Sequence, residues 1–275
     1  MPTGNEVKAP DVLAGTCRTL VMGIVNVTPD SFSDGGRFLD PGRAIEQAWR
    51  LIDEGADILD IGGESTRPTH TQVSADEEWR RLEPVLHELC GRVPVPVSVD
   101  TYKADTAIRA LGAGANIIND VWGGLADPDI LRVVAEARCP YIWMHNRHEP
   151  AADKAYETLV AETLAGIEQC LQAGIADDKL WLDPGIGFGK TYTQNLAVLK
   201  RLPDYCNLGY KVLLGTSRKS VIGYTLDVPP GDRLEGSLAT VAIGIQAGVR
   251  CVRVHDVLAT VRTARMVEAV LGVEE

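Results

Sequence analysis

Residues 21–36 read Val21-Met22-Gly23-Ile24-Val25-Asn26-Val27-Thr28-Pro29-Asp30-Ser31-Phe32-Ser33-Asp34-Gly35-Gly36, a short apolar run followed by a polar loop. The apolar half is typical of a strand buried on both faces in a parallel sheet. Asn26 ends this run with an uncharged oxygen, and two carboxylates flank Phe32 in the loop. In isolation the segment also fits an ordinary strand-to-helix turn. Because the pattern recurs along the chain, we predict a strand whose carboxyl end carries chemically active groups.

The composition fits one soluble domain with a large core. The chain has 275 residues and is 45% hydrophobic. Acidic residues outnumber basic ones by 38 to 27, and the net charge of -11 argues against nucleic acid or an anionic membrane as the main partner. Six widely spaced cysteines favour reduced thiols. Residues 1–16 lack the apolar core of a signal peptide, and no run of 18 apolar residues follows, so we expect a cytoplasmic protein.

A strand-then-helix unit occurs eight times. The first strand is followed by expected helices over 43–54, 75–89, 103–111, 128–137, 156–173, 194–202, 236–247 and 257–271. The strands expected between these helices cover 56–63, 95–99, 116–118, 141–144, 180–182, 211–214 and 251–254. Glycine follows four of these helices, at a position suited to a left-handed turn: Gly55, Gly114, Gly174 and Gly248.

Eight such units in about 250 residues predict a single closed (β/α)8 TIM barrel. We assign the barrel to residues 20–275 and an N-terminal extension to residues 1–19. An open doubly wound sheet is the alternative. It would need fewer units, and no glycine-rich dinucleotide fingerprint follows the first strand.

Polar residues end every predicted strand. In a barrel of this kind the carboxyl ends of the strands form the face that carries the active site. Alternate residues of a strand share a side, so Asp100 lies on the side of Ser98, Asp183 on that of Trp181, and His255 on that of Arg253. We expect these polar side chains to point inward and meet at the barrel mouth.

Five motifs, in this order, resemble the dihydropteroate synthase family of folate biosynthesis: Asn26-Val27-Thr28-Pro29-Asp30-Ser31-Phe32-Ser33-Asp34-Gly35-Gly36, Gly62-Gly63-Glu64-Ser65-Thr66-Arg67-Pro68, Asp183-Pro184-Gly185-Ile186-Gly187-Phe188, Gly215-Thr216-Ser217-Arg218-Lys219-Ser220 and Arg253-Val254-His255-Asp256. The resemblance covers about residues 20–272. It implies a (β/α)8 transferase that joins 4-aminobenzoate to (7,8-dihydropterin-6-yl)methyl diphosphate, giving 7,8-dihydropteroate and diphosphate. Thr69-His70 and Asn146-Arg147 depart from the pattern of many members.

The resemblance implies a pterin site made of Asp100, Asn119, Asp183 and Lys219, with Lys219 donating to the ring carbonyl. A pterin edge alternates donors and acceptors, so paired carboxylate and amide groups suit it. Two alternatives concern the sixth loop. Asp183-Pro184-Gly185 also fits a helix-capping turn, and the run 184–191 ends like a phosphate-binding Walker loop, although Pro184 stands where that loop requires glycine.

The resemblance implies a diphosphate site made of Arg253, His255 and Thr66. Arg253 offers a planar fork on the eighth strand, where barrels of this type often bind phosphate. The alternative is an Arg253 paired with Asp256, beside a histidine buried in the core.

For a metal, the resemblance implies Mg²⁺ held by Asn26, with Asp30 and Asp34 as possible helpers. Magnesium takes few protein oxygens and keeps waters and phosphate oxygens. His145 and His148 suggest a zinc alternative, but no third ligand is evident.

The second substrate is expected beside residues that resemble the family's aminobenzoate positions: Phe32, Thr66, Arg67, Pro68, Phe188 and Ser217. Thr66 and Ser217 can form hydrogen bonds, and Phe188 can pack against a ring. An ordinary exposed loop is the alternative for Thr66 to Pro68.

The motifs contain no nucleophile paired with a base, and a neutral aromatic amine needs none. We expect a dissociative substitution whose catalytic residues are Asp100, Asp183, Lys219, Arg253 and His255. The loops after Asn26 and Gly63 would close to exclude water. A pterin-binding methyltransferase barrel and a non-catalytic pterin-binding homologue are the functional alternatives. The resemblance further implies a homodimer and a sulfonamide target.

Overall fold

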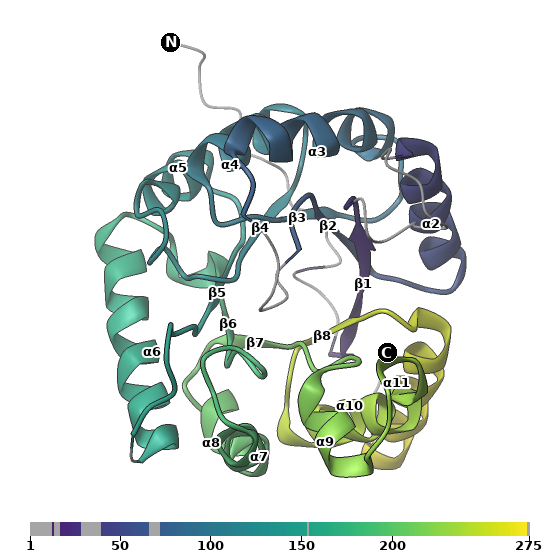
Figure 1. The fold of residues 1–275 in the computed structure, drawn as a ribbon, viewed down its shortest axis with the longest axis vertical. Coiled ribbons are helices and arrows are strands. Elements are labelled where there is room, and N and C mark those ends of the chain that lie inside the picture. Colours follow the sequence, from purple (N-terminus) through teal and green to yellow (C-terminus); the bar gives the residue numbers. More distant parts are fainter. Residues whose placement is uncertain (1–12, 14–16, 29–39, 66–71, 153, 274–275) are drawn as a thin grey trace.

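The computed structural model describes residues 13, 17–28, 40–65, 72–152 and 154–273. Within these residues, parallel strands form a closed barrel in chain order, and β8 pairs with β1 (Figure 1). The strands are β1 (Leu20–Asn26), β2 (Ile58–Gly62), β3 (Val97–Asp100), β4 (Ile117–Asp120), β5 (Tyr141–Met144), β6 (Leu180–Asp183), β7 (Lys211–Leu214) and β8 (Cys251–Val254). The predicted barrel is confirmed, and the open doubly wound sheet is wrong.

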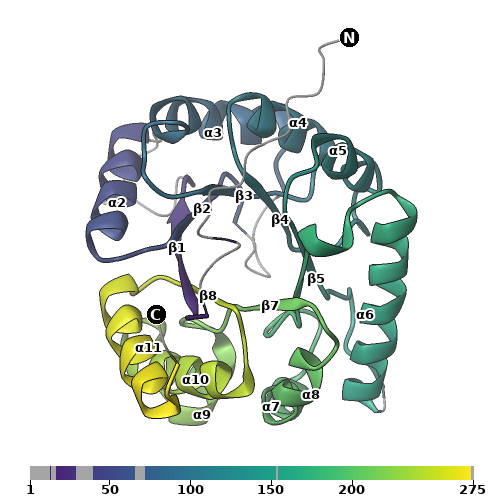
Figure 2. The ribbon, with the colours of Figure 1, turned by 180° about the vertical axis from the view of Figure 1, so that it is seen from behind.

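Helices surround the strand ring on its outside, as the views from either end of the barrel show (Figures 1 and 2). They are α2 (Pro41–Asp53), α3 (Ala75–Leu89), α4 (Ala104–Gly112), α5 (Asp129–Ala137), α6 (Ala155–Gln172), α7 (Tyr192–Lys200), α8 (Leu202–Cys206), α9 (Ser220–Leu226), α10 (Leu234–Ala247) and α11 (Val257–Leu271). Short 3-10 turns, η2 (Asp177–Lys179) and η3 (Pro230–Asp232), precede β6 and α10.

The helix predictions hold with two differences. The expected helix 194–202 ends at Lys200, and a separate α8 begins at Leu202, because Pro203 favours the first turn of a new helix. Helix α9, after β7, was not predicted. The four glycines expected in left-handed turns have φ between 95° and 100°.

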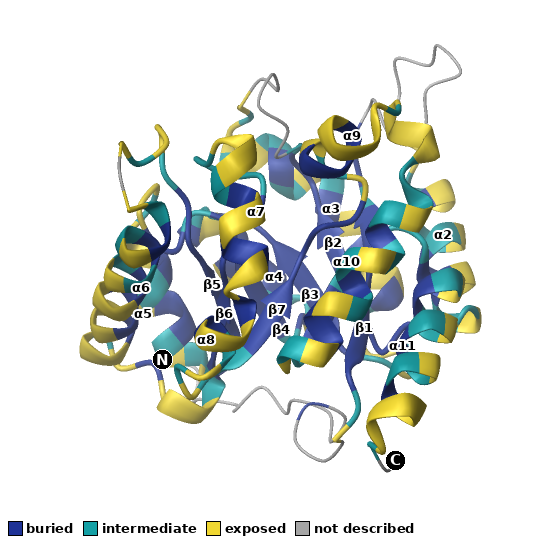
Figure 3. Cartoon of the chain, turned by 90° about the horizontal axis from the view of Figure 1, so that it is seen from below, coloured by how far each residue is buried: buried dark blue, intermediate teal, exposed yellow. Residues whose placement is uncertain are grey.

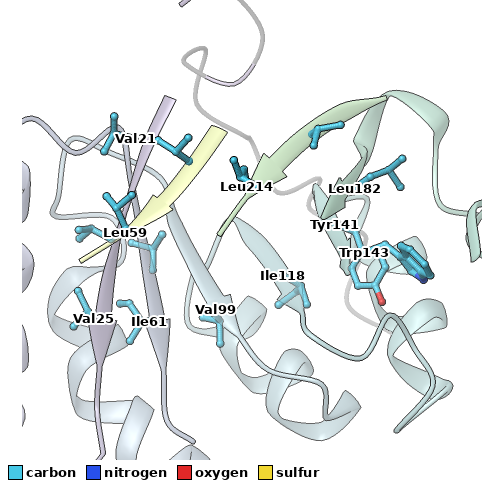
Figure 4. Close-up of a cluster of buried hydrophobic side chains, with 14 of the residues drawn as sticks. Val21, Val25, Leu59, Ile61, Val99, Ile118, Tyr141, Trp143, Leu182 and Leu214 are labelled. Atoms are coloured by element: carbon cyan, nitrogen blue, oxygen red, sulfur yellow. The ribbon is translucent and has the colours of Figure 1, made fainter. Parts of the chain in front are cut away.

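Strand side chains divide into two apolar layers. Those pointing outward pack under the helices, as Val21, Leu59, Val99 and Leu214 do (Figure 4). Those pointing inward fill the barrel with Leu20, Met22, Ile58, Ile117, Ile142, Trp181, Leu213 and Cys251. The strands are therefore buried on both faces, whereas the helices expose their outer sides (Figure 3).

Leu13 belongs to the predicted N-terminal extension, yet it is buried and joins the inward apolar layer. Its carbonyl accepts a hydrogen bond of 3.2 Å from Lys211 Nζ, at the start of β7. At this residue the extension packs into the amino-terminal end of the barrel, opposite the end that carries the predicted site residues.

All six cysteines are free thiols in the structure. In the described part of the chain, no helix is both long enough and apolar enough to span a membrane.

Candidate active site

Four strands bring a buried ionic network to the carboxyl-terminal end of the barrel. Arg253 on β8 donates from Nε to Oδ2 of Asp60 on β2 over 2.6 Å, and from Nη2 to Oδ2 of Asp100 on β3 over 2.7 Å. Asn119 on β4 donates from Nδ2 to the same oxygen of Asp60 over 3.1 Å. The inward direction predicted for Asp100 and Arg253 is thus confirmed, and these side chains form one connected set.

Burial dominates the electrostatics of this network. It raises the pKa of Asp100 to about 7, while the charge of Arg253 acts in the opposite direction. Burial alone would lower the pKa of Arg253, but Asp60 and Asp100 outweigh it and raise that pKa above its ordinary value. Arg253 therefore stays a cation, and its charge favours the carboxylate form of Asp100.

Asp183, Lys219 and Arg253 converge around Gly215, just after β7. A Cβ placed on Gly215 would lie 3.7 Å from Lys219 Nζ, 3.8 Å from Asp183 Oδ2 and 3.9 Å from Arg253 Cβ. Burial lowers the pKa of Lys219 to about 8, and Asp183 opposes this shift. Burial likewise raises the pKa of Asp183 against the attraction of Lys219. Acidic and basic site residues thus meet at the carboxyl-terminal end of the barrel.

The loop after β6 contacts two of these residues, Asp183 and Lys219. Asp183 Oδ1 accepts from the backbone N–H of Gly185 over 2.7 Å. Lys219 donates to the carbonyl of Ile186, and its Nζ lies 4.6 Å from the centroid of the Phe188 ring. The helix-capping alternative for Asp183 is wrong, because Thr191 caps α7.

His255 and Ser217 are joined directly. Ser217 Oγ lies 3.0 Å from His255 Nδ1 and accepts from the His255 backbone N–H over 3.2 Å. Asp256 instead binds Arg218 through two hydrogen bonds, of 3.0 and 2.5 Å. The alternative pairing of Arg253 with Asp256 is therefore wrong, and His255 is partly exposed rather than buried in the core.

Asn26 ends β1 at the same face and is partly exposed. A Cβ placed on Gly62 would lie 3.9 Å from Asn26 Oδ1 and 3.7 Å from Asp100 Oδ2, so an amide oxygen and a carboxylate oxygen flank that glycine. Such hard oxygen donors fit Mg²⁺, which needs few protein ligands.

The zinc alternative does not fit the structure. Within the described ranges, no group of three or more His, Cys, Asp or Glu side chains is placed to hold a metal. His145 Nε2 instead lies 2.8 Å from Glu162, and the His148 ring lies 4.7 Å from the ring of Trp122.

A second polar cluster lies at the base of the loop after β2. Lys103 Nζ donates to Glu64 and, over 3.0 Å, to Glu78, which also accepts from Thr106 Oγ1 over 2.8 Å. The backbone N–H of Val73 donates to Glu64 Oε2 over 3.4 Å. This cluster holds together the described residues on either side of the loop. The predicted site residues Phe32, Thr66, Arg67 and Pro68, with Asp30, Asp34, Thr69 and His70, lie outside the described residues.

Two residues of the site were missed by the sequence predictions. Asp60 interrupts the apolar strand 56–63 on the same side as Ile58, and a carboxylate at such a position signals an inward polar group. Lys190 was considered only as part of a Walker loop. Its ammonium donates to the carbonyls of Gly185 and Phe188, an arrangement that does not fit a phosphate-binding loop.

Comparisons with known proteins agree with this geometry. Residues 22–255 match the family described as pterin binding enzyme. The chain is 49% identical to dihydropteroate synthase of Bacillus subtilis over 263 residues, which cover 96% of this chain and 92% of that protein.

Solved structures give the same result. Dihydropteroate synthase of Clostridium difficile, crystallised in the presence of pteroic acid, has a TM-score of 0.89 and 48% identity, covering 92% of this chain and 97% of that one. The Xanthomonas albilineans enzyme with 4-aminobenzoic acid has a TM-score of 0.89 and 44% identity, covering 94% of each chain. The resemblance seen in the motifs is confirmed: this chain belongs to the dihydropteroate synthases, within the pterin-binding enzyme family.

Proposed function

We propose that the chain joins 4-aminobenzoate to (7,8-dihydropterin-6-yl)methyl diphosphate and releases diphosphate. The observation that carries this proposal is the convergence of Asp183, Lys219 and Arg253 around Gly215. One end of the barrel thereby offers carboxylates to a heterocycle and cations to an anionic leaving group.

The pterin ring would lie against Asp100, Asn119 and Asp183. These buried groups supply carboxylate acceptors and an amide that can both donate and accept, which suits the alternating edge of a pterin. Lys219, held between Asp183 and Phe188, is within reach of a ring carbonyl. Oδ1 of Asp60 and Oγ of Ser98 make no hydrogen bond with any other described residue, so they are further polar groups for the ring or a water molecule.

The reaction would be a dissociative substitution. The bond between the methylene carbon and the diphosphate oxygen breaks, and its electron pair leaves with the diphosphate. The amine lone pair of 4-aminobenzoate then forms the carbon–nitrogen bond, and that nitrogen releases one proton. Asp100 and Asp183 would stabilise the positive charge that develops on the pterin methyl group, while Arg253 and His255 stabilise the departing anion.

Mg²⁺ would be held by Asn26 and by diphosphate oxygens. When bound, it neutralises charge on the leaving group. Asp100 Oδ2 and Asn26 Oδ1 both lie within 4 Å of a Cβ placed on Gly62, so Asp100 is a carboxylate close to the proposed metal ligand.

The aminobenzoate ring would lie near Phe188 and Ser217. Ser217 contacts His255, and Phe188 contacts Lys219, so this position borders both the diphosphate and pterin positions. The roles of Phe32, Thr66, Arg67 and Pro68 are supported by the motifs alone. Inhibition by sulfonamides is supported by 42% identity to the Yersinia pestis enzyme, which was solved with a sulfonamide drug.

We also propose a homodimer and a cytoplasmic location. Helices α10 and α11 pack against each other and expose Ile243, Leu258, Met266 and Val270, apolar side chains that suit a subunit interface. The free thiols suit a reducing compartment. Light scattering and cell fractionation would check these two proposals.

Diphosphate release tests the function. Release should require the pterin substrate, 4-aminobenzoate and Mg²⁺ together. Arg253→Met should lower kcat about 100-fold or more through loss of leaving-group stabilisation. Arg132→Met, an exposed arginine on α5, is the matched control and should behave like the wild type. Release that is independent of the amine would reject the synthase assignment.

A further inference from the structure

Lys190 lies in the β6–α7 loop, and several hydrogen-bond acceptors surround its ammonium group. Nζ lies 2.9 Å from the carbonyl oxygen of Gly185, 3.0 Å from that of Phe188 and 2.9 Å from Nδ1 of His145. The carbonyl oxygen of His145 is a fourth acceptor, 3.4 Å from Nζ, so the three ammonium hydrogens face four acceptors, all of them uncharged. One side chain joins two points of its own loop to the residue that follows β5.

The histidine accepts this hydrogen bond in its neutral form. Burial lowers the pKa of His145 to about 4, so its imidazole is uncharged near neutral pH. Because Nδ1 accepts from Lys190, the ring proton is on Nε2, which lies 2.8 Å from Glu162 Oε2. Glu162 also binds Arg147 over 2.8 Å. His145 is therefore held by partners on both sides, and it forms a fixed support for Lys190.

The backbones around Lys190 approach each other too closely for side chains. A Cβ on Gly185 would lie 1.9 Å from the carbonyl oxygen of His145, and one on Gly189 would lie 2.4 Å from that of Arg147. The loops after β5 and β6 are therefore in direct backbone contact. Lys190 supplies donors where several carbonyl oxygens meet at this contact.

Gly185 and Phe188, whose carbonyl oxygens accept from Lys190, each contact a residue of the active site. The carbonyl oxygen of Gly185 accepts a hydrogen bond from Lys190, and the N–H of the same residue donates to Asp183 over 2.7 Å. The carbonyl oxygen of Phe188 also accepts a hydrogen bond from Lys190, and the ring of Phe188 packs on Lys219. Lys219 itself donates to Ile186, between these two points. Lysines from two different loops thus hold the segment 185–188.

We propose that Lys190 is a positioning residue for both substrates: it orients the Asp183 carboxylate through Gly185 and the ring beside Lys219 through Phe188. The assignment rests on the proposed function. Burial lowers the pKa of Lys190 to about 7, and Asp183 opposes this shift, favouring the ammonium form that donates to these acceptors.

The test compares Lys190→Met and Lys190→Gln with Lys200→Met, an exposed lysine at the end of α7. Calorimetry gives the Kd for a pterin that lacks the diphosphate, and steady-state assays give kcat and the KM for 4-aminobenzoate. For Lys190→Met we expect the pterin Kd and the aminobenzoate KM each to rise about tenfold or more, because small displacements of substrate-positioning groups have large effects. Lys190→Gln, which retains amide donors, should be affected less, and Lys200→Met should match the wild type.

Circular dichroism and thermal unfolding identify which variants are folded. An unchanged pterin Kd in a folded Lys190 variant would overturn the proposal, and so would failure of both variants to fold, because either result assigns Lys190 to stability alone. Calorimetry does not depend on turnover. A wild-type chain that binds pterin without forming dihydropteroate would therefore refute the proposed function while the comparison at Lys190 still stands.

Discussion

Arg253 Nη2 lies 2.7 Å from Asp100 Oδ2, so a residue predicted to bind diphosphate is paired with one predicted to bind the pterin. The two belong to strands β8 and β3, which are not neighbours in the barrel. A side chain that holds one substrate group therefore also sets the charge and direction of a side chain that holds another.

The first prediction concerns the charge of Asp100. Asp100→Asn keeps the shape of the side chain but removes the negative charge near the developing pterin cation. We expect kcat to fall about 100-fold, with a much smaller change in the KM for 4-aminobenzoate. Steady-state kinetics measure both values. Comparable losses in kcat and in aminobenzoate binding would count against a cation-stabilising role.

The second prediction concerns Asp60, which is completely buried and accepts from both Arg253 and Asn119. Asp60→Asn should lower the free energy of unfolding by about 2–3 kcal/mol, because it removes a charged partner of a buried arginine. Urea denaturation measures this loss. Asp76→Asn, at an exposed ion pair with Arg109, is the control and should have a smaller effect. Equal losses in the two variants would contradict the role given to Asp60.

The third prediction is a pH dependence. With a raised pKa of about 7, Asp100 gains a proton as the pH falls through neutrality, and the neutral acid is a poorer acceptor for pterin N–H groups. Binding of a pterin without diphosphate should therefore weaken toward acid pH. Arg253 lowers this pKa, so Arg253→Met should move the midpoint to higher pH. Calorimetry over the neutral range checks the direction, and a midpoint that stays fixed or moves to lower pH would be inconsistent with it.

The fourth prediction uses two glycines with positive φ. Gly185 has φ of 66° and no room for a Cβ, whereas Gly91 has φ of 75° and nothing within 4 Å. Gly91→Ala should cost about 1–2 kcal/mol of stability from backbone conformation alone. Gly185→Ala adds a clash with His145 and should cost about 1–3 kcal/mol more. Chemical denaturation compares them, and similar costs would show that the backbone contact is not tight.

Much of the fold followed from periodicity. Strand alternation placed Asp100, Asp183 and Arg253 on inward faces, and the structure has them there because a residue's side of a strand depends only on its position along it. The bounds of β5, β7, β8 and α11 also agreed. The break between α7 and α8 was missed, although Pro203 marks it.

The partners of each side chain could not be predicted in the same way. Arg253 and Asp60 are 193 positions apart in the chain. They pair because the barrel closes and the long arginine side chain extends across its end. A local sequence pattern contains no information about either condition. Lys190 was missed for a related reason, because its acceptors are backbone carbonyls and any sequence provides those.

The most direct test is a crystal structure with the dihydropterin methyl diphosphate bound. We expect the ring to contact Asp100, Asn119 and Asp183, while Arg253 and His255 donate to diphosphate oxygens. A diphosphate bound away from Arg253 and His255, or a ring that does not reach Asp183, would contradict it.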